Sequence, residues 1–132
     1  MADMRKTILL MLLAIVSGSA MAEWIQVSET DTNTVYADPA TIHMAARTVK
    51  MWSLYDFKAV QSIDGLKPYL SSKQQYEYDC KEMKSRRRAS SQHSKNMGGG
   101  KVVYSDTYTS KWKPVPPDSG LEILWKFACL KK

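Results

Sequence analysis

Alternation of apolar and polar positions is the strongest structural signal in this chain, and it is clearest over residues 48–57. The apolar positions of this segment divide between two faces, with Val49, Met51, Tyr55 and Phe57 on one and Trp52 and Leu54 on the other. A period of two residues is that of a β-strand. Because both faces are apolar in the middle, we predict a central strand that is covered on both sides.

Three further segments carry weaker strand patterns. Residues 24–27 and 34–37 are predicted to be short strands, the second ending at Asp38-Pro39. The stretch 41–46 is ambiguous between a helical turn and a loop. Residues 74–80 alternate cleanly and are predicted to be a half-buried antiparallel strand, with Tyr76, Tyr78 and Cys80 on its core side.

The next stretch, 81–94, is polar and basic, and Gly98-Gly99-Gly100 after it is a strong turn signal. Residues 101–109 are predicted to be the returning strand. Together these segments predict a long hairpin whose far end is charged and exposed.

The C-terminal region changes from proline-rich to helical. Three prolines in 113–117 predict an extended segment outside the sheet ladder. Asp118 or Ser119 is a suitable N-cap for a helix with Glu122 in its first turn. The helix carries two apolar stripes, one of Leu121, Leu124, Trp125 and Ala128, and a second on nearly the opposite side of Ile123, Phe127 and Leu130.

Strands first and one helix last predict an α+β domain with an antiparallel sheet. A helix with two apolar stripes is covered on more than one side. The helix therefore lies in a concave sheet, or its outer stripe of Ile123, Phe127 and Leu130 meets a partner such as a second copy of the protein.

The N-terminus predicts export. Residues 1–22 combine a short basic start, an apolar run of ten residues and the triplet Ala20-Met21-Ala22, which together are typical of a secretory signal peptide cleaved between Ala22 and Glu23. The apolar run is about half the roughly 20 residues that a membrane span needs. No cysteine follows it, so no lipid anchor is expected, and no later segment is apolar enough to cross a membrane. Residues 23–132 then form a single domain.

The two cysteines, Cys80 and Cys129, are an even pair in a protein predicted to be exported. This predicts a disulfide, which would close a loop of about 50 residues and contribute about 4 kcal/mol in the chain-entropy model. Two buried free thiols are the alternative.

Positive charge is concentrated in residues 81–95, which contain six basic residues and a single acidic one, Glu82. We take Lys84, Arg86, Arg87, Arg88 and Lys95 as candidate ligand-binding residues. Guanidinium groups suit sulfate, phosphate or carboxylate, so the expected targets are acidic polysaccharide, lipid headgroups or an acidic protein surface. The alternative is a solvated loop that keeps the protein soluble. Nucleic acid is not an expected partner, because the predicted compartment and the core-facing aromatics argue against it.

Catalytic and metal-binding patterns are lacking in the sequence. His43 and His93 do not combine with the cysteines at a metal-ligand spacing, and neither a nucleophile elbow nor a phosphate loop ahead of a helix occurs. We therefore expect no metal, no cofactor and no enzymatic activity.

A series of short landmarks resembles the surface-adhesin protein E-like family of Gram-negative bacteria. In sequence order these are Trp24, Val35-Tyr36-Ala37-Asp38, Val49-Lys50-Met51-Trp52, Tyr76-Glu77-Tyr78-Asp79-Cys80, Gly100-Lys101-Val102-Val103, Trp112 through Ser119, and Cys129. The resemblance implies a six-stranded antiparallel sheet with a C-terminal helix held to its concave side by a disulfide. It also implies dimers and, in adhesin members, binding of host matrix and serum proteins.

The sequence thus predicts an α+β fold of about five to six strands and a small exported binding protein with an adhesin-like role. The alternative is a periplasmic structural or assembly protein, dimeric or not, with no adhesive role. We expect a periplasmic or secreted protein, with association at the cell surface left open, because a lipid-anchored adhesin would need a cysteine after the signal.

Overall fold

The computed structural model describes residues 23–63, 65 and 67–131. In sequence order the elements are β1 (Ile25–Glu29), β2 (Asn33–Ala45), β3 (Thr48–Gln61), β4 (Tyr69–Asp79), β5 (Lys84–His93), the 3-10 turn η1 (Asn96–Gly98), β6 (Val102–Asp106), β7 (Lys113–Pro114) and α2 (Gly120–Lys131). The predicted signal segment, with Ala22 at its end, lies outside the described residues, and Glu23 is the first of them.

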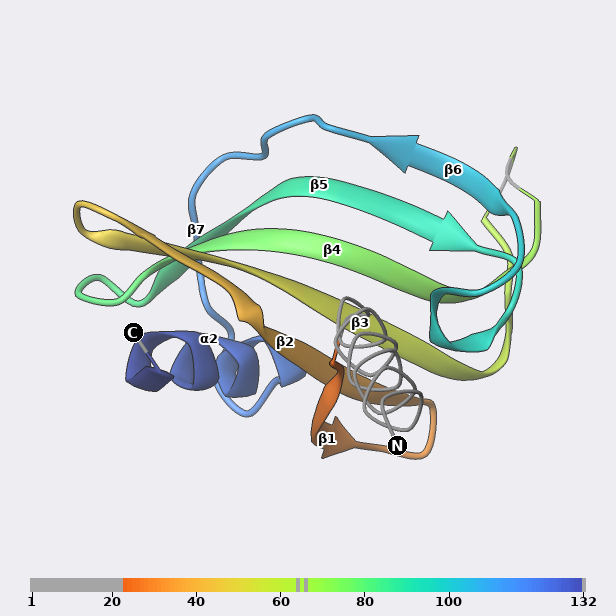
Figure 1. Cartoon of the computed structure of the whole chain (residues 1–132), viewed down its shortest axis with the longest axis horizontal. Helices are drawn as coiled ribbons and strands as arrows, with labels where there is room; N and C mark the ends of the chain where they lie inside the picture. Colours follow the sequence, from red (N-terminus) through yellow and green to blue (C-terminus); the bar gives the residue numbers. More distant parts are fainter. Residues whose placement is uncertain (1–22, 64, 66, 132) are drawn as a thin grey trace, which may run out of the picture.

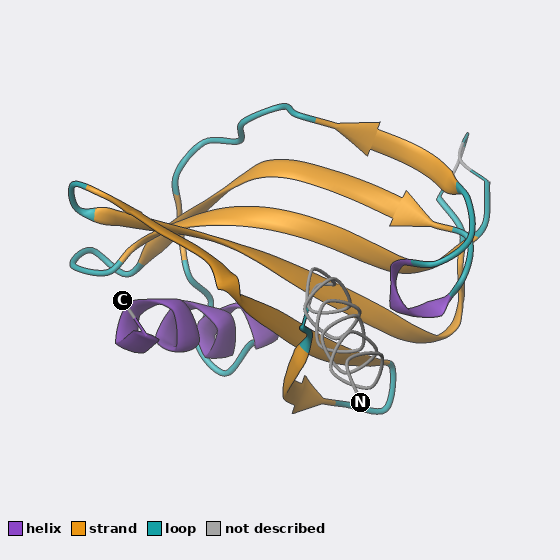
Figure 2. Ribbon diagram, in the orientation of Figure 1, coloured by secondary structure: helices purple, strands orange, loops and turns teal. Residues whose placement is uncertain are grey.

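The strands β1 to β6 pair in sequence order, each antiparallel to its neighbour, and the short β7 pairs with the start of β5. The sheet is strongly twisted, and α2 lies against one face of it at the end where the C-terminus is found (Figure 1). The same arrangement is seen by element type in Figure 2. The predicted α+β fold, an antiparallel sheet with a C-terminal helix on one face, is confirmed.

The hydrophobic core lies between α2 and the middle of the sheet. Leu124 and Ala128 of the helix are fully buried against Val35, Ala37, Val49, Met51 and Tyr78 of β2, β3 and β4. As predicted, β3 is central, between β2 and β4. Leu54, on the face of β3 away from Met51, is also fully buried.

Strand β2 corrects the prediction that the second strand ends at Asp38-Pro39 and that 41–46 is a helical turn or a loop. The ladder to β3 passes from the pair Asp38–Trp52 to the pair His43–Lys50, so β2 bulges there. Proline is tolerated at a bulge because no ladder bond from its nitrogen is needed. The Thr41 hydroxyl accepts the Trp52 N–H at 2.9 Å in place of a backbone carbonyl.

The basic stretch corrects the predicted hairpin. The chain reverses directly after β4, where the Asp79 carboxylate accepts the N–H groups of Lys81 and Glu82 at 3.0 and 2.9 Å and Met83 has a φ of 53°. The stretch then returns as β5, a strand inside the sheet and not the exposed end of a hairpin. As predicted, the chain turns at the glycine triplet and returns as a strand, β6, which pairs with β5.

The segment before the helix is partly in the ladder, which corrects the prediction for 113–117. Lys113 and Pro114 pair with Ser85 and Lys84, and the Val115 N–H donates to the Met83 carbonyl at 3.1 Å. Proline is acceptable here because β7 is a short edge strand. The predicted N-cap is confirmed at Ser119, whose hydroxyl accepts the Glu122 N–H at 3.1 Å.

Candidate functional site

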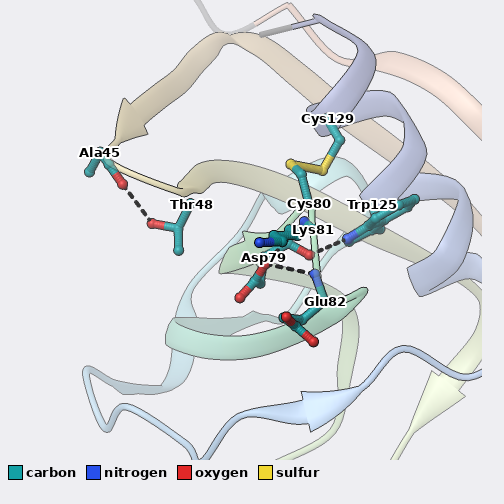
Figure 3. The surroundings of a disulfide bond; sticks show 8 residues. All are labelled: Ala45, Thr48, Asp79, Cys80, Lys81, Glu82, Trp125 and Cys129. Atoms are coloured by element: carbon teal, nitrogen blue, oxygen red, sulfur yellow. Dashed lines mark hydrogen bonds between the residues drawn. A yellow bond between two sulfur atoms is a disulfide. The ribbon is translucent and has the colours of Figure 1, made fainter.

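The disulfide is the firmest of the predicted sites. Cys80, just after β4, is bonded to Cys129 in α2, with the two Cα atoms 5.7 Å apart. Beside it the Trp125 indole donates to the Asp79 carbonyl at 2.9 Å (Figure 3). The covalent bond and the indole hydrogen bond together fix the C-terminal turns of α2 to the end of β4 and the turn that leads into β5.

The predicted ligand-binding residues do not form one cluster. Lys84, Arg86, Arg87 and Arg88 lie in β5, whereas Lys95 follows the other end of that strand. From Lys84 to Lys95 an extended backbone spans about 36 Å. Lys84 and Lys95 are exposed and the three arginines are half-buried.

Arg86 and Arg88 share one carboxylate on the face of the sheet away from α2. The Arg86 Nε donates to Glu77 Oε1 at 2.8 Å, and the Arg88 Nη1 donates to the same atom at 3.2 Å. The other oxygen of Glu77 accepts the Thr48 hydroxyl at 2.7 Å. Burial raises the pKa of Glu77, but these hydrogen bonds and the charge of Arg86 outweigh it, so the pKa is lowered overall.

Arg86 also lies over an aromatic ring. Its guanidinium carbon is 4.5 Å from the centre of the Trp112 ring, within range of a cation–π interaction. Arg86 is therefore fixed between the Glu77 carboxylate and Trp112, in a geometry set by the fold.

Arg87 belongs to the opposite, α2-facing side of the sheet. Arg87 pairs in register with Tyr76, and strand alternation points it to the face opposite that of Arg86; the bulge in β5 follows, before the pair Gln75–Ala89. Its Nη2 is 3.8 Å from Asp106 Oδ2, too long for a hydrogen bond, and its buried Nε has no acceptor within the described residues.

Three tyrosines lie on this side of the sheet, which faces α2. Burial raises the pKa of Tyr55, Tyr76 and Tyr78, and the nearby Arg87 charge partly offsets the rise at Tyr76. The rings of Tyr76 and Tyr78 stack with centroids 6.0 Å apart. These hydroxyls are neutral donors at physiological pH.

Around Glu77 the face away from α2 is positively charged. The cross-strand rows run Lys50–Glu77–Arg86 and Thr48–Asp79–Lys84. With Arg88, four cations stand against two carboxylates here. We refer to Lys50, Lys84, Arg86 and Arg88 as the basic face.

Sequence reasoning missed Glu77 as the centre of this arrangement. The alternation of 74–80 places Glu77 correctly on the polar face of its strand, but its partners become visible only when β5 is paired with β4. Two carboxylates on the outward face of a strand, Glu77 and Asp79, followed by a basic run are the signal that would have indicated the pairing.

The two histidines lie in different environments. His43 is exposed on β2. His93 is buried, with Nε2 2.8 Å from the Ser91 hydroxyl, and burial followed by the charge of Lys73 lowers its pKa. Among the described residues no group of three or more His, Cys, Asp or Glu side chains is arranged to hold a metal ion.

The outer stripe of α2 is only partly exposed. Leu130 is 83% exposed and Ile123 39%, whereas Phe127 packs partly buried against the core. No helix in the described ranges is long and apolar enough to cross a membrane.

The fold matches solved structures of protein E from Haemophilus influenzae. One crystal form aligns with a TM-score of 0.60 and 11% identity over 84% of this chain and 97% of that one. A second structure aligns with a TM-score of 0.62 and 12% identity over 84% and 86%. Protein E from a non-typeable strain aligns with a TM-score of 0.60 and 13% identity over 84% and 78%. At these identities the likeness shows a shared fold.

No curated protein is significantly similar to the chain in sequence. The family model described as surface-adhesin protein E matches residues 24–130, nearly the whole described region. The chain therefore belongs to the surface-adhesin protein E family.

Proposed function

We propose that this protein is an exported adhesin-type binding protein that holds an anionic surface of a host matrix or serum protein, or an acidic polysaccharide, on its basic face. The observation that carries the proposal is membership of a surface-adhesin family over residues 24–130. Solved structures with this fold include protein E of Haemophilus influenzae, and the description of the family as a surface adhesin supports an adhesive role.

The basic face is the part of the molecule best suited to such contacts. Arg86 and Arg88 are 28% and 33% exposed, so each retains donors toward solvent beyond those used on Glu77. Exposed Lys84 and half-buried Lys50 extend the positive surface along the neighbouring positions. Arg87 and Lys95 are not part of it, because Arg87 faces α2 and Lys95 lies at the far end of β5.

The test must spare the residues that hold the sheet together. Lys81 and Lys84 are exposed, and neither ammonium group forms a hydrogen bond or ion pair within the described part of the protein. Lys81→Gln/Lys84→Gln therefore removes positive charge at the Lys84 end of the basic face, leaves Glu77 and its partners unchanged and places no new carboxylate opposite Asp79. Lys67→Gln/Lys101→Gln changes the net charge equally at the opposite end of the sheet and is the matched control.

We expect the Lys81/Lys84 variant to elute from immobilised heparin at a lower salt concentration than wild type and to bind coated matrix and serum proteins less well. The Lys67/Lys101 control should resemble wild type. If binding falls equally in both variants, the net charge of the protein and not the basic face is responsible. If binding by all three proteins is insensitive to salt, the interaction is not electrostatic. Fractionation of cells with added protease tests export itself, since an adhesin must be accessible from outside.

A second candidate function is assembly of two protomers through the outer stripe of α2. The exposure of Ile123 and Leu130 favours it, because apolar side chains at such positions gain stability when a partner covers them. Phe127 is a poor probe, since its substitution also removes core packing. Sedimentation of wild type beside Ile123→Asp/Leu130→Asp tests the idea, and a wild-type monomer would refute it.

A further inference from the structure

A cavity lies on the side of the sheet that faces α2, apart from the main part of the basic face. It opens to solvent and has a volume of about 260 Å³. Residues of β4, β5, the segment before the helix and the first turn of α2 line it, among them Tyr76, Arg86, Arg87, Ser110, Lys113 and Leu121. A ligand the size of one amino-acid residue fits such a volume.

The charged residues that line the cavity are all basic. Arg87 and Lys113 contribute positive charge, and Arg86 reaches the lining although Glu77 and Trp112 engage its guanidinium. Within the described residues no carboxylate lines the cavity. The nearest acidic partner of Arg87 is Asp106, at 3.8 Å. An anion entering the cavity therefore meets basic residues in the wall and competes for Arg87 with Asp106, which lies outside the lining.

Arg87 is held in place by backbone contacts. Its N–H donates to the Ser110 hydroxyl at 2.9 Å, and the Ser110 N–H donates to its carbonyl at 2.9 Å. The segment that contains Ser110 follows β6 back along β5, as the course of the chain in Figure 1 shows. The guanidinium thus extends from a backbone that is fixed by both segments, which lowers the entropy lost when a ligand binds.

Arg87 also carries the donor that lacks an acceptor. Its Nε is buried with no hydrogen-bond partner in the described part of the protein, and so is the Tyr78 hydroxyl on the same side of the sheet. The buried Nε is closed to a ligand, so an incoming anion meets the terminal Nη groups of this side chain, which is 35% exposed. The N–H groups of the two Nη atoms form a parallel pair that matches the two oxygens of a carboxylate.

The remaining walls favour an apolar body attached to that carboxylate. Pro114, Pro116 and Leu121 line the cavity together with the half-buried Tyr76. Apolar walls with a few placed polar groups are typical of small-molecule sites.

We propose that this cavity binds a small carboxylate with an apolar body, anchored by the Arg87 guanidinium between β5, the proline segment and the start of α2. The carboxylate comes from a free organic acid or from the last residue of a peptide. The cavity recognises the same group in both cases, and the choice of probes separates the two.

The experiment titrates the isotopically labelled full-length protein by NMR. N-acetyl-leucine is the probe, N-acetyl-leucinamide is its uncharged counterpart, and 4-methylpentanoate offers a carboxylate and an apolar body without a peptide group. We expect N-acetyl-leucine to cause saturable shifts at the amides of Ser85, Arg87, Ser110 and Leu121, and the amide counterpart to cause none. Stronger binding of N-acetyl-leucine than of 4-methylpentanoate assigns the site to the carboxylate end of a peptide, and the reverse order assigns it to a free acid.

Two variants locate the anchor. Arg87→Lys keeps the charge but removes the paired donors, and we expect about tenfold weaker binding of N-acetyl-leucine. Arg47→Lys makes the same exchange at an exposed position in the turn between β2 and β3 and should bind like wild type. Equal losses in both variants, equal binding of the acid and its amide, sulfate that binds as well as the carboxylate, or no saturable shift in wild type would each overturn the proposal. If Arg87→Lys does not fold, the acid and amide arms in wild type still decide it.

Discussion

Replacing Glu77 with glutamine removes the carboxylate on which the basic strand depends. Glu77 is 8% exposed and receives donors from Arg86, Arg88 and Thr48. Glutamine keeps the size and one acceptor oxygen but removes the charge, so both guanidinium groups lose their counter-ion.

The expected loss of stability lies between two reference values. Breaking a fully buried ion pair from one side costs about 3–5 kcal/mol, whereas exposed pairs contribute at most about 1 kcal/mol. Arg86 and Arg88 are about a third exposed, so water hydrates their freed charges and moves the cost toward the lower value. We expect a decrease of about 2 kcal/mol in the free energy of unfolding, or a Tm lower by about 8 °C for a domain of this size.

Urea denaturation followed by tryptophan fluorescence, without reductant, measures this decrease. Glu82→Gln makes the same chemical change at an exposed position in the turn between β4 and β5 and should stay within about 0.5 kcal/mol of wild type. Equal stability of the two variants at neutral pH would refute the role given to Glu77.

The pH dependence gives a second readout of the same carboxylate. Because the folded pKa of Glu77 is lower than its ordinary value of 4.5, its contribution is complete above that value and is lost as the pH falls through the folded pKa. The stability difference between wild type and Glu77→Gln should therefore shrink as the pH is lowered through this range. A difference that does not change with pH would show that shape, and not charge, is responsible.

Three further predictions concern the helix and the buried histidine. Cys129→Ser should lower the free energy of unfolding by about 4 kcal/mol, because the disulfide to Cys80 closes a loop with a sequence separation of 49, and urea denaturation checks this. Ser119→Ala removes the hydroxyl that accepts the Glu122 N–H and should cost about 1 kcal/mol in the same assay, a loss that Ser119→Asp should largely avoid. The pKa of His93 is lowered in the folded protein, so as the pH falls its imidazole is protonated in the unfolded state before it is protonated in the folded state. The free energy of unfolding should therefore decrease as the pH drops below 6.5 toward the folded pKa. His93→Gln should flatten this pH dependence, and an unchanged dependence would contradict the role given to His93.

Where a single side-chain period decides the structure, the sequence is sufficient to predict it. The alternation in 74–80 predicts the burial of Tyr78, and the inner stripe of the helix predicts the burial of Leu124 and Ala128. These positions are apolar because each faces the core, so the pattern and the packing carry the same information.

The predictions from sequence are wrong where a polar side chain takes the place of a ladder carbonyl, of an apolar residue or of a turn glycine. At the bulge in β2, the Thr41 hydroxyl takes the place of a ladder carbonyl, and the strand continues past a proline. In β5 the buried positions include Ser85, Ser90 and Gln92, so no apolar alternation marks the strand. The turn before it needs no glycine, because the Asp79 carboxylate satisfies its N–H groups. Such substitutions depend on partners far away in the sequence, which a local pattern does not contain.

Arg86 and Arg88 stabilise the sheet through Glu77 whether or not a ligand is bound, and this determines which variants are informative about function. Arg86 and Arg88 stabilise a nearly buried Glu77, so reversing their charge would place two new carboxylates beside an existing one. Loss of binding in such a variant would follow from unfolding as readily as from a lost contact. Lys84 pairs in register with Asp79 on the same face but is exposed, so its charge is available to a partner at little cost to the sheet. Lys84 rather than the arginine run is therefore the position at which adhesion and stability can be separated.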